Sequence, residues 1–374
     1  MTAPPPAPEP RRPRPPIPVT VLTGFLGAGK TTLLNRLLAD PALADTAVLI
    51  NEFGEVGLDH LLVRTVEEGI VMLASGCVCC TVRGDLVAAL EDLLRALDNG
   101  RVEPFSRVVI ETTGLADPVP VIQTLMAHPY LAMRFRLDAV VTVVDAINGL
   151  ATLDAHPEAV RQVAVADRLV ITKTDLVGDD AARTTLARLE ARLAALAPGA
   201  VRLEAARGEA DAAAVLAAGL YDPASKTPDV ARWLNEEAVA AAAGTTAHDH
   251  ADGIRSFALT TDQAIGTAAL DMFLDLLRGA HGPKLLRVKG VVKVAEFPER
   301  PVVIHGAQHV FHPPSVLDRW PDDDARTRIV FILKDMEPAV VQALFDAFLG
   351  IARPDQPDRA ALTANPLAIP GRPS

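Results

Sequence analysis

The sequence predicts an α/β protein in which a mostly parallel sheet carries helices on both faces and a smaller α+β domain follows. Three observations predict this class. From Ile17 to about Leu220, β-branched segments alternate with helical patterns. A complete glycine-rich loop joins the first β-rich segment to the first helical one. A run rich in Ala, Gly and Thr at 238–253 then separates this part from a second set of strands and helices.

Each element follows from its local residue pattern, because short runs of Val, Ile and Leu between turn residues are typical of strands. In the first part these strands are expected at Ile17–Thr23, Ala47–Asn51, Gly69–Leu73, Arg107–Glu111, Ala139–Val144, Arg168–Thr172 and Ala200–Leu203. Helices are expected to begin near Gly29, Gly84, Pro118, Glu158, Asp180 and Glu209. The second part should hold strands Ser256–Thr260, Leu285–Ala295, Val302–His305 and Arg328–Leu333 and helices Gln263–Arg278 and Glu337–Leu349.

The domain organisation follows from these elements. We expect a disordered Pro- and Arg-rich tail at 1–16, the parallel-sheet domain at 17–237, a linker at 238–253, the α+β domain at 254–352 and a flexible tail at 353–374.

Composition narrows the function classes. The 374-residue chain has a net charge of −11 and a pI near 5.3, which argues against a general nucleic-acid or anionic-membrane binder. No apolar run reaches the roughly 18 residues of a membrane span, and the N-terminus lacks the apolar stretch of a secretory signal. The three cysteines are clustered, which fits a reducing compartment. We therefore expect a cytoplasmic protein.

The glycine-rich loop, Gly24-Phe25-Leu26-Gly27-Ala28-Gly29-Lys30-Thr31, is a complete Walker A motif in a strand–loop–helix context. Its backbone N–H groups and the following helix would cradle phosphates, which predicts a P-loop NTPase sheet. Lys30 is expected to be an exposed loop charge that reaches the β- and γ-phosphates, and the Thr31 hydroxyl would hold Mg²⁺. The predicted nucleotide contacts here are Gly24, Gly27, Ala28, Gly29, Lys30, Thr31 and Thr32.

Thr172-Lys173-Thr174-Asp175 follows an apolar strand and is similar to the guanine-recognition motif Asn-Lys-x-Asp. The Asp175 carboxylate can accept two hydrogen bonds from guanine that adenine cannot donate, and the Lys173 stem can lie along the purine. The alternative is an N-capping Asp after a strand. Thr172 stands where the motif has Asn, which weakens the expected bracing of the loop. The motif predicts GTP and GDP as ligands.

Two further segments follow strands of the same sheet. Glu111, at the end of Arg107–Glu111, holds the Walker B position and could bind a Mg²⁺-bound water, while Gly114 could place a backbone N–H near the γ-phosphate. The expected catalytic residues are Lys30, Thr31, Glu111 and Gly114. The acidic stretch Asn51–Asp59 is interpreted as a loop that reorganises with the γ-phosphate. The alternatives are a buried strand capped by a solvated acid and an ordinary acidic turn.

All three cysteines lie in Gly76-Cys77-Val78-Cys79-Cys80. Three thiolates at this spacing can bind zinc, cobalt(II) or copper(I) and leave one tetrahedral position for water, a carboxylate such as Glu52 or Glu55, or a His. A redox pair and inert buried thiols are the alternatives. In the linker, His248 and His250 are interpreted as part of a solvated flexible loop, and a weak metal-loading site with Asp249 and Asp252 is the alternative. In the second domain, His305, His309 and His312 are interpreted as isolated polar positions, although His305 and His309 could share a strand face.

Together these motifs resemble the CobW-type family of metallochaperone GTPases. The resemblance rests on Gly24–Thr32, Asn51–Asp59, Gly76–Cys80, Glu111–Pro118, Thr172–Asp175 and the Arg-x-Lys-Gly strand Leu286–Gly290, and extends over about residues 17–351. It implies slow, regulated GTP hydrolysis coupled to delivery of zinc or cobalt to a client metalloprotein, with a CobW C-terminal domain; a homodimer is possible. Here only His248 and His250 remain of the His-rich linkers of many relatives. A metal buffer or sensor, a dedicated metalloenzyme activator and a deviant ATPase are the rival hypotheses.

Overall fold

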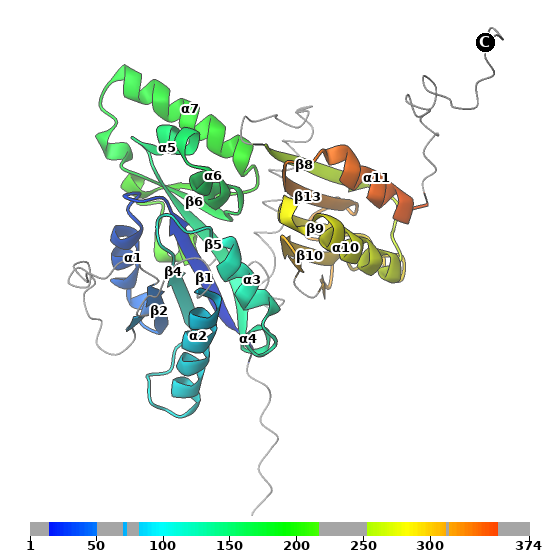
Figure 1. Cartoon of the computed structure of the whole chain (residues 1–374), viewed down its shortest axis with the longest axis horizontal. Coiled ribbons are helices and arrows are strands. Elements are labelled where there is room, and N and C mark those ends of the chain that lie inside the picture. Colours follow the sequence, from blue (N-terminus) through cyan, green and yellow to red (C-terminus); the bar gives the residue numbers. More distant parts are fainter. Residues whose placement is uncertain (1–14, 51–69, 73–81, 217–252, 312–313, 351–374) are drawn as a thin grey trace, which may run out of the picture.

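A computed structural model describes residues 15–50, 70–72, 82–216, 253–311 and 314–350, and these form two units (Figure 1). The first contains a parallel sheet flanked by helices, and the second contains an antiparallel sheet with two helices on one side. This confirms the expected fold class. In the described part of the chain, no helix is both long and apolar enough to cross a membrane.

The first unit is built around seven parallel strands in the order β3-β2-β4-β1-β5-β6-β7. The strands are β1 Ile17–Gly24, β2 Thr46–Ile50, β3 Ile70–Met72, β4 Arg107–Glu111, β5 Phe135–Asp145, β6 Arg168–Thr172 and β7 Val201–Glu204. Strands β2 to β4 lie on one side of β1 and strands β5 to β7 on the other, so the carboxyl end of β1 is a topological switch point. Ligands of open α/β sheets bind at such points, and the Walker A loop leaves β1 there.

Helices cover both faces of this sheet. One face packs against α1 Lys30–Leu38 and α8 Ala212–Leu216, and the other packs mainly against α2 Val82–Asp98, α3 Val119–Ala127, α6 Pro157–Ala164 and α7 Asp180–Leu196. The short helices α4 Pro129–Arg134 and α5 Gly149–Ala155 and the 3-10 turns Pro41–Leu43, Thr174–Leu176 and Ala205–Arg207 complete the unit. Strands buried on two faces are mostly apolar, as in β2, where four apolar residues follow Thr46.

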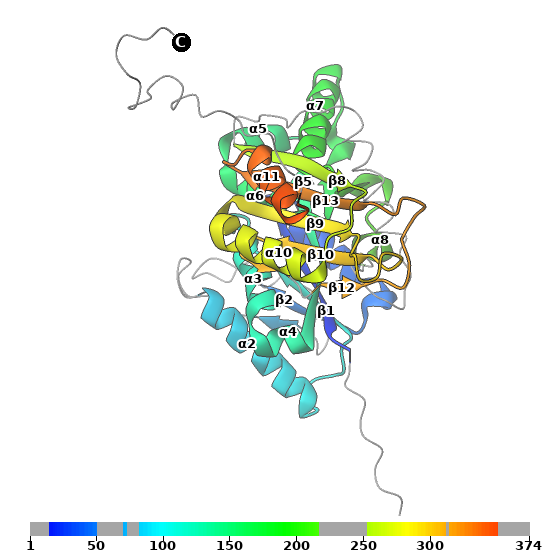
Figure 2. The ribbon, with the colours of Figure 1, turned by 90° about the vertical axis from the view of Figure 1, so that its right-hand side faces the viewer.

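The second unit has an antiparallel sheet in the order β11-β10-β9-β13-β8, with β12 beside β10. Its strands are β8 Ile254–Thr261, β9 Leu285–Val292, β10 Val302–Ala307, β11 Val310–Phe311, β12 Ser315–Val316 and β13 Thr327–Lys334. Its helices, α10 Thr267–His281 and α11 Pro338–Phe348, cover one sheet face, and a short turn, Gly282–Lys284, follows α10. Figure 2 shows both helices on the side away from the first unit.

The other face of the second sheet meets the first unit around one buried carboxylate. Asp167, just before β6, accepts hydrogen bonds from Arg287 Nη2 at 2.8 and 3.0 Å, and Lys289 Nζ also binds it. Its Oδ2 accepts the Val140 N–H at 2.7 Å. Arg287 and Lys289 belong to the Arg-x-Lys-Gly strand, so this motif holds the two units together. A second contact joins Gln123 to Gln308 at 2.8 Å.

Asp167→Ala should cost about 3–5 kcal/mol of unfolding free energy, because it leaves the buried Arg287 and the part-buried Lys289 without their carboxylate. Burial alone would raise the pKa of Asp167, but Arg287, Lys289 and the Val140 N–H bring it below the ordinary value of 3.8. The stabilisation is therefore complete above that value and is lost as pH falls through the lower folded-state pKa. Denaturant titration measures the loss. Adding Arg287→Met and Lys289→Met should recover most of the lost unfolding free energy. If it does not, the loss does not come from the two unpaired cations.

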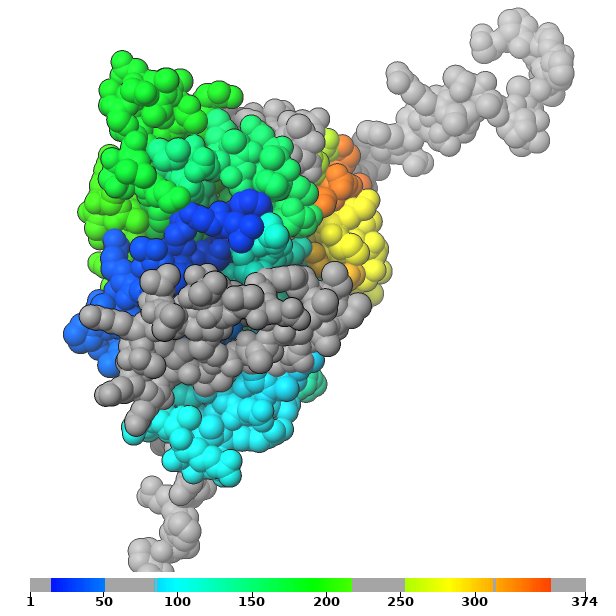
Figure 3. Space-filling model, turned by 60° about the vertical axis from the view of Figure 1, so that its left-hand side comes forward, coloured from blue at the N-terminus to red at the C-terminus, as the bar shows by residue number. Residues whose placement is uncertain are grey.

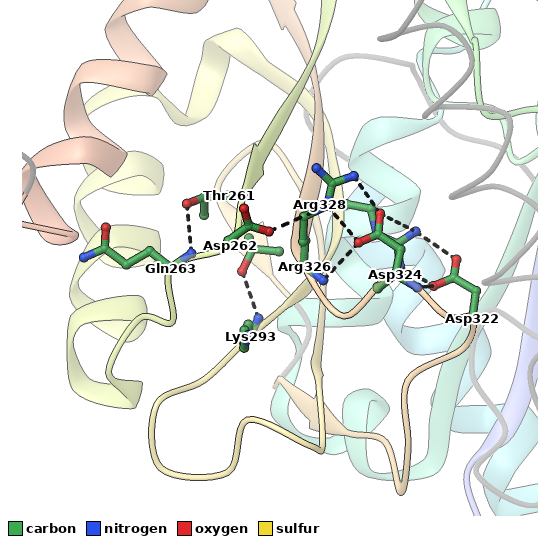
Figure 4. A network of polar contacts seen from close by, with 9 residues as sticks. Thr261, Asp262, Gln263, Lys293, Asp322, Asp324, Arg326 and Arg328 are labelled. Atoms are coloured by element: carbon green, nitrogen blue, oxygen red, sulfur yellow. Dashed lines mark hydrogen bonds and ion pairs between the residues drawn. The ribbon is translucent and has the colours of Figure 1, made fainter.

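A polar network ties the segment before β13 to the edge of the second sheet (Figure 4). Arg328 on β13 is buried and makes a two-pronged contact with Asp322 at 2.8 and 2.7 Å. Arg326 donates to Asp324 at 2.8 Å, and this hydrogen bond is the main reason that the pKa of Asp324 is lowered. The network fixes the segment that leads into β13 and lies in the second unit, away from the carboxyl edge of the parallel sheet.

The expected elements differ from the observed ones where distant contacts decide. β5 begins at Phe135, four residues before the expected Ala139, because Ile17 on β1 pairs with Phe135. The helix expected from Gln263 begins at Thr267, since Ile265 bridges to Val294 and the Glu296 carboxylate accepts the Thr267 N–H at 2.9 Å. Helices α4 and α5 and strands β11 and β12 were not predicted, because each is too short to show a period. The expected tails, except residues 15 and 16, and the expected linker, except Gly253, lie outside the described residues.

Candidate nucleotide-binding site

The Walker A loop requires its glycines for geometric reasons. Gly24, Gly27 and Gly29 have φ of 141°, 73° and 97°, a region that side chains disfavour. A Cβ on Gly24 would lie 2.3 Å from the Val143 carbonyl oxygen on the neighbouring strand β5. The loop therefore turns tightly against β5 before α1 begins at Lys30. In Figure 3 the dark-blue N-terminal elements reach the molecular surface beside the green ones.

Lys30 is buried, contrary to the expectation of an exposed loop charge. Its ammonium donates to the carbonyls of Gly24 at 2.8 Å and Phe25 at 3.3 Å. The Ala28 N–H donates to the same Phe25 carbonyl at 3.2 Å. The glycine-rich loop thus folds around the lysine ammonium, which places a positive charge inside it. That placement fits a phosphate.

Residues at the end of β6 hold the loop from outside. The Thr172 hydroxyl donates to the Ala28 carbonyl at 2.7 Å, and Lys173 Nζ donates to the Gly27 carbonyl at 2.9 Å. A trans peptide directs its C=O and N–H in opposite directions. Because the Ala28 carbonyl is held outward, the Gly29 N–H of the same peptide points to the opposite, inner side of the loop. Thr172 therefore contacts the Walker A loop from the position that Asn holds in the guanine-recognition motif.

Asp145, at the end of β5, is a site residue that the sequence analysis missed. Its Oδ2 accepts from Lys173 Nζ at 2.7 Å and from the Asn148 side chain at 2.9 Å, and its Oδ1 accepts the Ile147 N–H at 2.7 Å. Burial opposes its ionisation, but these hydrogen bonds prevail and lower the pKa of Asp145. An acid ending an apolar strand beside β1 was the available signal.

Asp175 lies in the turn Thr174–Leu176 and is exposed. Lys173, two residues earlier, has a left-handed backbone with φ of 60°. This unusual conformation sends the chain away from β6 directly after the loop contact. The motif therefore divides into a part bound to the Walker A loop and a part open to solvent.

Glu111 and Thr31 meet across the sheet edge. Thr31 Oγ1 donates to Glu111 Oε1 at 3.0 Å, although the residues are 80 positions apart. Glu111 is only 5% exposed, at the end of a strand that pairs with β1. A hydroxyl and a carboxylate in contact beside a phosphate loop are the oxygen ligands that Mg²⁺ prefers.

Gly114 packs directly against the Walker A loop. A Cβ on Gly114 would lie 2.6 Å from the backbone nitrogen of Leu26, so only glycine permits this approach. Beside this contact, a cavity of about 220 Å³ separates the loop from α5 and α6. Its lining includes Leu26, Ala28, Asp145, Asn148, Gln162 and Lys173.

The predicted metal ligands Glu52, Glu55, Cys77, Cys79 and Cys80 lie outside the described residues, as do His248, His250 and His312. The ends of the strands that precede two of these segments, β2 and β3, are described. Ile50 pairs with Met72 on one side and with Glu111 on the other. The chain therefore leaves β2 and β3 at the same sheet edge as the Walker A loop.

His305 and His309 of the second unit do not share a strand face. His305 lies on β10, whereas His309 lies in the turn before β11, where its Nδ1 contacts the Arg278 carbonyl at 3.2 Å. Within the described ranges, no three His, Cys, Asp or Glu residues cluster as metal ligands.

Comparisons with known proteins place both units. Residues 18–201 match the family model "CobW/HypB/UreG, nucleotide-binding domain", and residues 254–349 match "Cobalamin synthesis protein cobW C-terminal domain". The chain is 33% identical to the zinc chaperone YjiA of Escherichia coli, over 88% of this chain and 98% of that protein. It is 31% identical to the zinc chaperone CobW of Pseudomonas aeruginosa, over 89% and 91% of the two chains.

Two further similarities support this placement. The zinc-regulated GTPase metalloprotein activator 1 of Schizosaccharomyces pombe is 42% identical over 44% of this chain and 41% of that protein. The crystal structure of the Zn(II)-bound YjiA GTPase from E. coli superposes with a TM-score of 0.66 at 28% identity, over 91% of this chain and all of that one.

Proposed function

Because the chain belongs to the CobW/HypB/UreG family and carries the C-terminal domain of cobW proteins, we propose that it is a GTP-hydrolysing metallochaperone. It would bind zinc or cobalt(II) at Cys77, Cys79 and Cys80 and deliver the ion to a client metalloprotein. The observation that supports this most is the strand register. Ile50, Met72 and Glu111 end side by side, so the loops with the candidate metal ligands begin beside the phosphate loop.

The phosphate half of the site supplies the hydrolysis. Lys30 and the N–H groups of Gly27 to Thr32 would bind the β- and γ-phosphates, whose charge grows in the transition state. Thr31 and Glu111, in contact at 3.0 Å, would hold Mg²⁺, which supplies charge neutralisation when bound. Gly114, which packs on the loop, would sense the γ-phosphate through its backbone.

The base half of the site supplies guanine selectivity. Asp175 would accept hydrogen bonds from guanine, and the Lys173 stem would lie against the purine. Lys173 is already fixed by Asp145 at 2.7 Å and by the Gly27 carbonyl at 2.9 Å. The protein therefore loses little side-chain entropy at this position when the base binds.

Metal affinity is expected to depend on the bound nucleotide. GTP with Mg²⁺ would order the loop that carries Glu52 and Glu55, align the thiolates and tighten the metal site. Hydrolysis would loosen it and permit transfer. By linkage, the metal must raise GTP affinity by the same factor. Calorimetric titration of zinc or cobalt(II) into the GDP-bound and GTP-analogue-bound protein measures this factor directly.

The control for this experiment is the variant with Cys77, Cys79 and Cys80 all replaced by Ser. It should lose metal binding in both nucleotide states and keep GTP binding, because the phosphate loop is built from other residues. Thiolate ligation releases protons, so metal affinity of the native chain should rise with pH. Identical metal affinities in the two nucleotide states would leave an uncoupled GTPase and exclude the chaperone mechanism.

A further inference from the structure

A buried glutamine on α6 holds the segment that follows the Walker B strand. Gln162 is 1% exposed, and its Nε2 donates to the carbonyls of Gly114 at 3.1 Å and Ala116 at 2.9 Å. Both partners are acceptors, so the nitrogen of the amide must be the end that faces them. Gln162 thus supplies both amide hydrogens to one turn of backbone, 46 to 48 residues away in sequence.

Helix α6, which carries Gln162, is itself fixed on the sheet, and a second side chain of α6 contacts the same segment. The Thr142 hydroxyl on β5 donates to the Gln162 backbone carbonyl at 2.7 Å. Arg161, the preceding residue, contacts the Asp117 carboxylate at 3.1 Å. Asp117 in turn accepts the Val119 N–H at 3.0 Å at the start of α3. Two adjacent side chains of α6 therefore position residues 114–117.

The segment that Gln162 holds has little freedom on its other side. A Cβ on Gly114 would meet the Leu26 backbone nitrogen at 2.6 Å, so the segment is wedged between α6 and the Walker A loop. Gln162 also lines the cavity behind that loop. A shift of the Gln162 amide would therefore move Gly114 relative to the phosphate loop.

We propose that Gln162 is a positioning residue that sets the response of the Gly114–Ala116 segment to the γ-phosphate. The inference rests on the proposed GTPase function and deepens it. Gln162 acts through backbone carbonyls and does not touch the nucleotide. It fixes the turn in the orientation from which the Gly114 backbone reaches the γ-phosphate. The phosphates that GDP shares with GTP are bound by the Walker A loop and do not depend on Gln162.

A side chain of similar size at position 162 could fill the space of Gln162 without donating hydrogen bonds to the turn. Methionine has nearly the volume of glutamine but no donor, so Gln162→Met would leave the buried Gly114 carbonyl and the part-buried Ala116 carbonyl without the hydrogen bonds from Gln162. Glutamate keeps the shape and turns a second acceptor toward them. Activity should therefore decrease from the wild type to Gln162→Met to Gln162→Glu, whereas a role in packing alone would give all three proteins similar activity.

The test measures kcat, KM and the affinities for GDP and a GTP analogue in the full-length protein. Gln162→Met should lower kcat by about tenfold, while GDP affinity stays unchanged and the preference for the GTP analogue over GDP shrinks. Arg161→Met, at a partly exposed position, should act in the same direction more weakly, and it keeps the test informative if Gln162 variants unfold. Gln123→Met, the same change at a buried glutamine of α3, is the matched control.

The outcomes separate this inference from the function on which it rests. A wild-type protein that does not hydrolyse GTP would overturn the proposed function itself. A wild type that hydrolyses GTP, together with a Gln162→Met protein of unchanged kcat and unchanged nucleotide preference, would overturn only the role of Gln162. Equal losses in Gln162→Met and Gln123→Met would assign the effect to general destabilisation and would also overturn it.

Discussion

Lys30→Ala is expected to lower the kcat of GTP hydrolysis by about 10²- to 10³-fold or more, because the variant loses the ammonium that would face the charge developing on the transferred phosphate. The same ammonium holds the carbonyls of Gly24 and Phe25 in the described chain. Alanine should therefore also loosen the Walker A loop and weaken GDP binding. Phosphate release under saturating GTP measures the first effect, and nucleotide titration measures the second.

The fold should survive this change, since the side chains of Leu33, Leu34 and Leu37 anchor α1 in the core independently of Lys30. Lys284→Ala, in the exposed turn after α10, removes the same charge far from the site and serves as the control. Turnover by Lys30→Ala at the wild-type rate would show that phosphate transfer takes place elsewhere.

Asp175→Asn is expected to weaken GTP binding by about 10²-fold or more, because two hydrogen bonds to a charged acceptor contribute about 1.5–3 kcal/mol each. The introduced amide presents a donor where guanine also donates. It matches the extra carbonyl of xanthine, so the variant should gain affinity for xanthine nucleotides. Competition of GTP, ATP and xanthosine triphosphate against a fluorescent nucleotide reports all three affinities.

The control for the base site is Asp180→Asn, the same substitution at an exposed acid in the first turn of α7. It should leave the nucleotide ranking unchanged. Equal binding of GTP and ATP by the wild-type protein would remove the guanine assignment, and the Lys173 contacts would then serve only the Walker A loop.

Local pattern was sufficient for most of the parallel sheet. The strands Arg107–Glu111 and Arg168–Thr172 begin and end where their apolar runs predict, because strands buried on both faces tolerate almost no polar residue inside. The Walker A loop could also be predicted from the sequence, since its glycines adopt backbone angles that few other residues tolerate. The start of α10 could not be predicted from local pattern, because the Thr267 N–H is capped by Glu296 on a loop distant in sequence.

The sequence by itself determined the fold class, the phosphate loop, the guanine motif and the family resemblance, because each is written in neighbouring residues. Only the tertiary structure showed that Lys30 is buried, that Thr172 braces the loop, and that Asp145, Gln162 and Asp167 have partners on other elements. The side-chain contacts of Thr172 with Ala28 and of Asp145 with Lys173 join residues 144 and 28 positions apart. They depend on which strand ends become neighbours in the sheet, and no periodicity within a single segment encodes that order.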